Sequence, residues 1–320
     1  MIAALRLLAM LALAVPSALF AQGYPAKPVR LVVGYSPGGG VDINARLLAS
    51  KLSEYLGQQV IVDNKPGANT NIATEFVSKA APDGYTLLVN TPSIAINMAL
   101  YKNPGFDTLR DFTAVSMFSS SPNIIVVNSS LGITSTEQLV ALARAKPGKL
   151  NYSSSGSGST QHLAGELFKT RTRTDFVHVP YKGTSPALTA LIGGDVDFSF
   201  ANIPAIHSHV KSGRLRPLAS TGSKRSQLMP EVPTLKEIGI DIDVVVWYGV
   251  FAPAGTPREI IDKLASLIAR AAHAPDMRQR LLDQGAEPAG NTPEEFSRIL
   301  RAEVATWAEA VKASGARVDE

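Results

Sequence analysis

Short apolar segments alternate with segments whose apolar residues recur at helical spacing. Residues 29–34 form the first apolar run, and in residues 41–56 the apolar positions follow one face of a helix. The pattern then predicts a strand at residues 59–62, a helix at residues 69–81 and a strand at residues 86–90. This β-α-β-α-β order predicts a parallel sheet with helices on both faces.

The alternation starts again after a strand-rich stretch at residues 112–128. Residues 134–220 contain helices and strands in turn, and residues 244–251 form a second long apolar strand. Three helices, each entered at a proline, close the chain. The chain therefore runs through the same α/β pattern twice.

Two α/β units connected by two long strands predict a particular architecture. We expect an α/β fold with two Rossmann-like lobes joined by two crossing strands, with a central cleft between the lobes. The predicted first lobe combines residues 22–121 with residues 252–320, and residues 122–251 form the second lobe. Ligands of such sheets bind beyond the carboxyl ends of the strands, so binding residues are expected in the strand-to-helix loops.

The N-terminal 21 residues differ from the rest of the chain. Arg6 precedes an apolar run at residues 7–15, and Ala21 supplies a small residue before a cleavage point. A membrane anchor is the alternative, but the run is short beside the about 20 apolar residues of a membrane span. We therefore expect residues 1–21 to be a signal peptide that exports a periplasmic protein.

Composition narrows the function classes. Apolar residues make up 45% of the chain and charged residues 18%, which is typical of a globular protein. The net charge of +4 is scattered along the sequence, so no nucleic-acid partner is expected. The absence of cysteine excludes disulfides, thiolate catalysis and Cys-ligated zinc.

The first strand-to-helix loop, residues 34–40, ends in three consecutive glycines before the helix that carries Asp42. Glycine lets the main chain approach a ligand closely, and the free N–H groups of a helix N-terminus attract anions. A plain flexible turn is the alternative. Asp42 would repel an anion at these amides, so it either caps the loop or receives an ammonium or hydroxyl group of the ligand.

The second loop, residues 153–160, is rich in serine and glycine and ends at Thr160, where a helix begins. Its hydroxyls and amides suit carboxylate or carbonyl oxygens, whereas a Ser/Gly linker is the alternative. Three more strand ends carry small or polar candidates: Thr91, Gly183 with Thr184, and Asn202. Together the five loops predict a wide, hydrogen-bonding cleft.

Groups for catalysis and metal binding are sparse. No Gly-x-Ser-x-Gly elbow follows an apolar strand, and His207 and His209 lack a carboxylate at ligand spacing. We expect no catalytic residue, no metal site and no cofactor. A secreted hydrolase that uses Ser155 or Ser159 with His162 is the alternative.

Trp247 lies on the second crossing strand and is a further candidate ligand contact. A half-buried aromatic side chain at such a position either packs on a ligand or fills the core of a hinge. The sequence favours neither of these two alternatives.

Several specific motifs occur in combination. Residues 29–34 are followed by Pro-Gly-Gly-Gly-Val-Asp at residues 37–42, and further motifs follow at residues 64–68, 81–87, 146–152, 162–168, 178–183 and 252–257. Taken together, they resemble the receptors of tripartite tricarboxylate transporters, also called the Bordetella uptake or Bug family. The resemblance covers essentially all of the mature chain. The chain departs from it at Ala201, where many members have aspartate, and at Asn69 and Thr70, where many have glycine.

The resemblance implies a type II periplasmic-binding-protein fold and a receptor that delivers a small carboxylate to a membrane permease. Members are known for di- and tricarboxylates, acidic amino acids and aromatic acids. It also implies that main-chain amides and ordered waters hold the carboxylate. By motif match the residues concerned are Ser36, Gly38, Gly39, Asp42, Ser155, Ser159, Thr160 and Gly183. We expect a monomer with transient permease contacts; a receptor that serves a sensor kinase is a further alternative.

Overall fold

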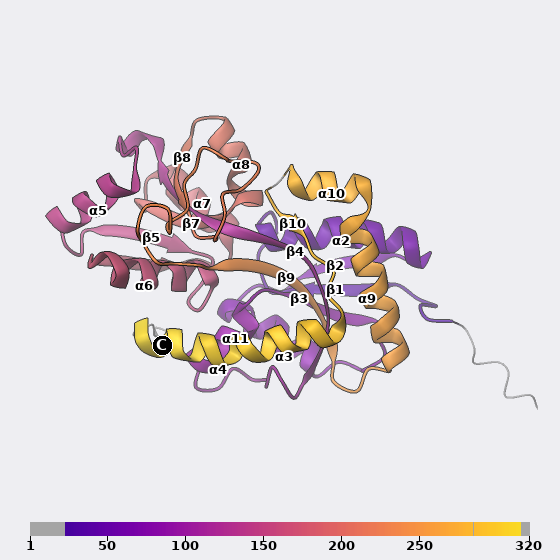
Figure 1. Ribbon diagram of the computed structural model, residues 1–320. Coiled ribbons are helices and arrows are strands. Elements are labelled where there is room, and N and C mark those ends of the chain that lie inside the picture. The colour runs from indigo at the N-terminus through magenta and orange to yellow at the C-terminus, as the bar shows by residue number, and fades with distance from the viewer. Residues whose placement is uncertain (1–22, 284, 315–320) are drawn as a thin grey trace, which may run out of the picture.

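The computed structural model describes residues 23–283 and 285–314. The predicted signal peptide, residues 1–21, lies outside the described residues. The described chain forms two α/β lobes, which are connected through a mixed sheet with the strand order β2-β1-β3-β9-β4-β7-β5-β6 (Figure 1). This arrangement confirms the expected fold of two α/β lobes with crossing strands.

The first lobe is built on three parallel strands: β1 (Val29–Val33), β2 (Val60–Asn64) and β3 (Thr86–Asn90). Its helices are α2 (Gly40–Leu56), α3 (Asn71–Ser78) and α4 (Ser93–Leu100). Leu31 and Val33 of β1 pack in the same core cluster as Leu48 of α2, whereas Val32 packs with Ala73 of α3. Apart from the exposed Arg30, both faces of β1 are therefore buried, which explains its mostly apolar sequence.

The second lobe repeats this arrangement. Its strands are β5 (Leu150–Ser154), β6 (Phe176–Pro180), β7 (Phe198–Asn202) and β8 (Leu215–Ser220). Its helices are α5 (Thr136–Ala145), α6 (Thr160–Thr172), α7 (Thr184–Gly193) and α8 (Ile203–Lys211). Ser135 and Ser159 begin α5 and α6, because each hydroxyl accepts the N–H of the residue three positions later.

Strand β4 (Phe112–Asn128) crosses from one lobe to the other. Residues up to Pro122 pair with β9 (Val245–Pro253), whereas residues from Asn123 onward pair with β7 and β8. The expected lobe boundary at residues 121–122 falls at this change of partners. The expected boundary at residues 251–252 falls inside β9, which pairs with β3 and β4 only. β9 is apolar on both sides of that point, so its sequence carries no mark of where pairing with the first lobe begins.

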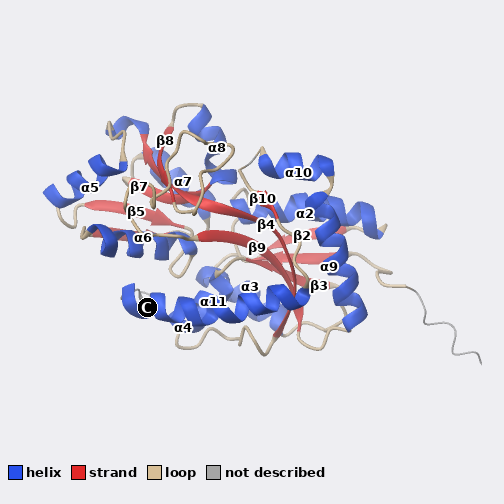
Figure 2. Cartoon of the chain, in the orientation of Figure 1, coloured by secondary structure: helices blue, strands red, loops and turns tan. Residues whose placement is uncertain are grey.

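Three helices close the described chain as expected: α9 (Arg258–His273), α10 (Pro275–Leu282) and α11 (Pro293–Ser314). The short strand β10 (Glu287–Pro288) pairs with β4. Helix α11 packs against α4 and β4, and also against α6 of the second lobe. Figure 2 shows it as a long helix that runs past both lobes.

Two local features differ from the sequence expectation. The predicted helix at residues 69–81 becomes regular only at Asn71, because Ala68, Asn69 and Thr70 have φ angles of 45°, 45° and 76°. Helix α4 was not expected at all. Five of its eight residues are buried, so it has no exposed polar face from which a helical period is readable.

Candidate functional site

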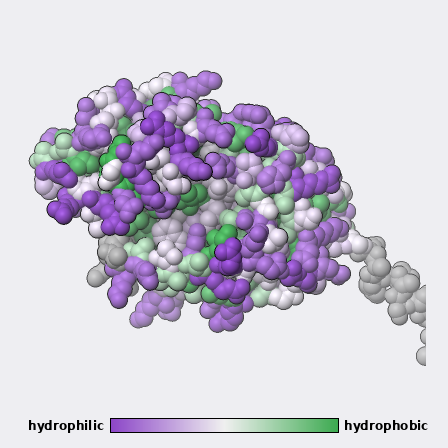
Figure 3. Space-filling model, in the orientation of Figure 1, coloured by the Kyte–Doolittle hydropathy of each residue, from purple (hydrophilic) through white to green (hydrophobic). Residues whose placement is uncertain are grey.

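A hollow of about 380 Å³ lies where loops of the two lobes meet. The first lobe lines it with Gly34, Tyr35, Gly67, Ala68, Asn69 and Tyr101. The second lobe lines it with Ser155, Gly156, Ser157, Pro180, Tyr181 and Lys182. These residues include the loops after β1, β5 and β6, so the hollow lies at carboxyl ends of parallel strands. Figure 3 shows a paler, less hydrophilic recess between the more hydrophilic outer faces of the lobes.

The glycine-rich loop of the first lobe is held by Asp42. The Asp42 carboxylate accepts hydrogen bonds from Gly38 N–H at 2.9 Å, Arg46 Nε at 2.9 Å and Asn64 Nδ2 at 3.0 Å. Burial opposes ionisation of Asp42, but these hydrogen bonds outweigh it and lower the pKa of Asp42. Asp42 is not among the residues that line the hollow. Its contacts are those of a group that caps the loop.

The serine-rich loop of the second lobe is held by side chains of α6. Ser155 N–H donates to Gln161 Oε1 at 2.7 Å, and Gly158 N–H donates to His162 Nδ1 at 2.9 Å. The Ser159 hydroxyl accepts the N–H of His162 at 3.2 Å and so caps α6. Within the described residues the Ser155 hydroxyl makes no hydrogen bond, and Ser155 lines the hollow. It is therefore free to bind a ligand.

Two histidines stack beneath this loop. The ring centroids of His162 and His178 are 4.0 Å apart, with 12° between the ring planes. Burial, followed by the nearby Lys169 charge, lowers the pKa of His162 to about 4. Burial, followed by His162 and Lys169, lowers the pKa of His178 to about 2. Both imidazoles are therefore neutral at pH 7, and the His162 ring accepts a hydrogen bond from the main chain.

The two lobes touch around the hollow. Ser36 Oγ donates to the Lys182 carbonyl oxygen at 2.6 Å, and Gly183 lies so close that a Cβ there would be 3.1 Å from Ser36 N. Asn202 Nδ2 donates to the Tyr248 hydroxyl at 2.8 Å and lies directly against Gly40. Close approach of the two lobes therefore leaves no room for a side chain at position 40, and at position 183 the φ of +133° also favours glycine.

Buried amides and hydroxyls support the first-lobe wall. Asn69 Nδ2 donates to Asn97 Oδ1 at 2.8 Å, and Asn97 Nδ2 donates to the Asn69 carbonyl oxygen at 2.7 Å. The Tyr35 hydroxyl bonds Ser93 Oγ at 2.8 Å and Thr91 Oγ1 at 3.2 Å. This network holds Asn69 in its left-handed conformation, which favours glycine or asparagine.

The sequence-predicted candidates occupy different places. Ser155 lines the hollow, Ser36 and Gly183 touch at its rim, and Gly38 and Gly39 lie in the loop beside Ser36. Thr160 begins α6, and Thr184 begins α7 and accepts a hydrogen bond from Gln161 Nε2 at 3.0 Å. Thr91 is hydrogen-bonded to Tyr35, and Asn202 lies against Gly40.

Trp247 packs on Phe296 and Phe251, and its indole N–H donates to Glu303. These contacts are those of a side chain that fills the core.

Several lining residues escaped the sequence analysis. Tyr35, Asn69, Tyr101, Tyr181 and Lys182 line the hollow but were not candidates. In the sequence Asn69 stands out only as a departure from the family pattern, and the tyrosines carry no periodic or motif signal of their own. Position 101 in particular follows the unpredicted helix α4, so its place at the hollow was not readable.

No helix of the described chain is long and apolar enough to cross a membrane. Residues 23–283 and 285–314 also contain no group of three or more histidine, cysteine, aspartate or glutamate side chains able to hold a metal ion.

The chain is similar to known proteins over most of its length. The model for the family described as "Tripartite tricarboxylate transporter family receptor" matches residues 44–316. Protein BugT of Bordetella pertussis is 38% identical over 301 residues, which span 93% of this chain and 92% of BugT. The solved structure of R. palustris Rpa4515 with adipate is 38% identical, with a TM-score of 0.90, over 92% of this chain and 100% of that one. MatC from Rhodopseudomonas palustris, with bound malate, is 30% identical, with a TM-score of 0.86, over 90% of this chain and 100% of its own.

Proposed function

The chain belongs to the receptor family of tripartite tricarboxylate transporters, and from that premise we propose a periplasmic receptor that captures a small carboxylate between its two lobes. The two related structures contain adipate and malate, both dicarboxylates, which supports this ligand class. The mature protein is exported by residues 1–21, acts as a monomer and delivers its ligand to a membrane permease.

One observation carries the proposal. The side chains that line the hollow are hydrogen-bond donors, one cation and neutral groups, and no carboxylate is among them. Ser155 offers an unpaired hydroxyl, and Lys182 is the cation at the hollow. A carboxylate ligand therefore meets donors without an opposing negative charge, because Asp42 is turned into its own loop.

The function is binding by lobe closure. The hydrogen bond of Ser36 with Lys182 joins the two rims of the hollow. A ligand that contacts both the glycine-rich and the serine-rich side favours this state over one in which the rims are apart. The closed form is then the one that the permease recognises. Of the sequence-derived candidates, we propose Ser155 as a direct contact, with the Ser36 and Gly183 loops as the closing rims.

Thermal denaturation of the mature protein tests the proposal. The panel contains malate, adipate, succinate, citrate, glutamate and benzoate. A ligand present at about 100 times its Kd adds about 2.7 kcal/mol to the free energy of unfolding, which raises Tm by roughly 5 to 10 °C. Absence of a shift across this panel would contradict the proposal.

The Ser155→Ala variant tests the site itself. Loss of a hydroxyl that donates to a carboxylate weakens binding by roughly tenfold or more. The Tm without ligand stays unchanged, because the hydroxyl has no partner in the described protein. Ser266→Ala, at an exposed position of α9, is the matched control. Equal affinities of the two variants would remove Ser155 from the site.

A further inference from the structure

Helix α11 joins parts of the protein that lobe motion separates. It packs on α4 and β4 on one side and on α6 on the other. Helices α4 and α6 each lie directly behind a wall of the hollow, since Asn97 of α4 holds Asn69 and His162 of α6 holds the Gly158 amide. A helix that touches both is placed to influence how the walls meet.

One carboxylate of α11 makes two hydrogen bonds beside the apolar contacts of the helix. Glu303 Oε1 accepts the indole N–H of Trp247 of β9 at 2.8 Å. Glu303 Oε2 accepts the indole N–H of Trp307, one helical turn further along α11, at 3.2 Å. Among the described residues the Glu303 carboxylate makes no ion pair, and its side-chain hydrogen bonds are those with the two indoles. The two indole hydrogen bonds offset the cost of partly burying the Glu303 carboxylate, and much of this offset is lost if either indole moves.

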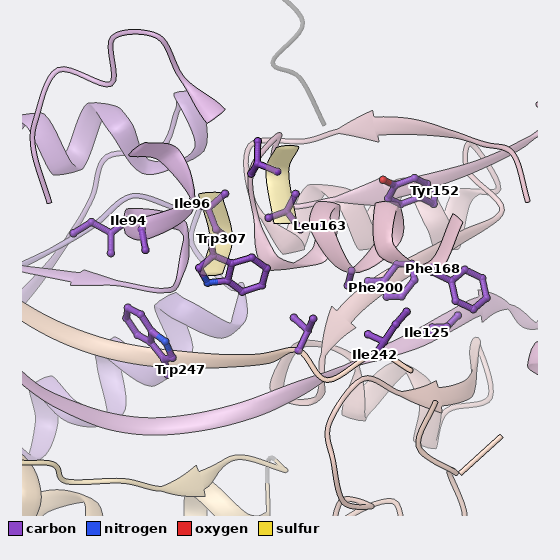
Figure 4. Packing of buried hydrophobic residues seen from close by; sticks show 14 of the residues in the cluster. Ile94, Ile96, Ile125, Tyr152, Leu163, Phe168, Phe200, Ile242, Trp247 and Trp307 are labelled. Carbon is purple, nitrogen blue, oxygen red and sulfur yellow. The ribbon is translucent and has the colours of Figure 1, made fainter. Parts of the chain in front are cut away.

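The two tryptophans belong to one core cluster but come from different elements, β9 and α11. Trp247 lies on the strand that follows the crossing between lobes, and its ring packs on Phe296 of α11 at a centroid distance of 5.2 Å. Trp307 belongs to the same core cluster as Ile96 of α4 and Leu163 of α6, and Figure 4 shows the three side chains close together. Ile96 directly precedes Asn97, and Leu163 directly follows His162. Asn97 and His162 are the side chains that hold the walls of the hollow.

We infer that Glu303 is a positioning residue for ligand capture, because it holds Trp307 between α4 and α6 and thereby stabilises the state in which the lobes touch. This inference rests on the proposed function for its biological meaning, since capture requires closure. The geometry itself concerns the lobes and not the ligand. It is therefore measurable in the unliganded protein, whatever the ligand proves to be.

The test measures the distance between spin labels on the two lobes by double electron–electron resonance. The chain has no cysteine, so Lys102→Cys and Lys211→Cys place one spin label on each lobe at exposed positions. Glu303→Gln keeps the side-chain shape but leaves one indole N–H facing an amide NH₂ group. Loss of one such hydrogen bond, about 1 kcal/mol, changes the ratio of closed to open populations about fivefold. Glu309→Gln, an exposed position on the same helix, is the matched control.

The expected result is a shift of the distance distribution to longer distances in Glu303→Gln, with Glu309→Gln identical to the parent. Trp307→Phe, which keeps a ring but removes the N–H, shifts it in the same direction and covers the case in which Glu303→Gln folds poorly. Unchanged distances in both variants, with or without a lower Tm, would overturn the inference and leave Glu303 a purely structural residue. Failure of every carboxylate to bind would refute the proposed function but would not alter these distances.

Discussion

Replacement of Gly158 by alanine separates the closing of the lobes from the stability of each lobe. Gly158 lies in the serine-rich loop of the second lobe, and its φ of +83° is in the left-handed region. A Cβ at this position would lie 2.9 Å from Asn69 Nδ2 and 2.9 Å from Asn97 Oδ1, and would also meet Leu100 Cδ2. All three neighbours belong to the first lobe, so the collision exists only while the lobes touch.

The free-energy cost of Gly158→Ala has two parts. Alanine in the left-handed region costs about 1 kcal/mol relative to glycine, and this strain applies whether the lobes are open or closed. The Leu100 side chain can turn aside, but the Asn69 and Asn97 amides are bound to each other at 2.8 Å and to the main chain at 2.7 Å. To make room for the methyl group, the closed state must break at least one of these buried hydrogen bonds, which costs about 1–3 kcal/mol.

Gly194→Ala is the matched control. Gly194 has a φ of +84°, and nothing lies within 4 Å of a Cβ built there, so it carries the same backbone strain without the collision. In urea denaturation without ligand, we expect the free energy of unfolding of each variant to fall by about 1 kcal/mol. Only Gly158→Ala should bind the best ligand of the panel roughly tenfold or more weakly by isothermal titration calorimetry. Equal affinities of the two variants would refute the view that this loop closes against Asn69 and Asn97.

Two further predictions concern the helix that supports the serine-rich loop. Because the folded pKa values of His162 and His178 are about 4 and about 2, below the 6.5 of an unfolded histidine, the unfolded chain binds protons first as the pH falls. The contribution of the two histidines to the free energy of unfolding, measured by urea titration, is therefore fully present above about pH 7. It falls by about 2 kcal/mol per histidine as the pH is lowered to 5. Equal free energies of unfolding at pH 7.5 and pH 5 would contradict this expectation. Ser159→Ala and Ser135→Ala each remove a helix cap and about 1 kcal/mol of stability, but only Ser159→Ala should also weaken ligand binding in calorimetry, since Ser135 begins α5 instead of α6.

The architecture was largely readable from the sequence because periodicity and loop chemistry agreed. Strand β1 is apolar on both faces, and the Gly57 that ends α2 adopts the left-handed conformation that glycine favours. Helix α4 is not predicted from the sequence, because its residues are apolar or small on nearly every side. The pairing of β9 with β3 and β4 is not readable from the sequence, because pairing partners depend on tertiary contacts that a strand pattern does not encode.

The candidate site was readable only in part. Motif and loop position predict Ser155, which lines the hollow and whose hydroxyl makes no hydrogen bond within the described residues. They could not decide between the two roles of Asp42. Arg46 lies four residues further along the same helix, but the contact with Asn64 of β2 depends on the tertiary structure. Tyr101 and Lys182 reach the hollow only through the three-dimensional arrangement of the lobes.

The central position of β9 has a consequence for how the chain folds. β9 lies between β3 and β4 in the sheet, yet it begins at Val245, 133 residues after β4 begins at Phe112. The first lobe therefore cannot complete its sheet until most of the polypeptide has been made. Such long-range pairing is intrinsically slow, because loop closure comes before the contacts that reward it. Closure of the first-lobe sheet by β9 is therefore expected to be a late step in the folding of this chain.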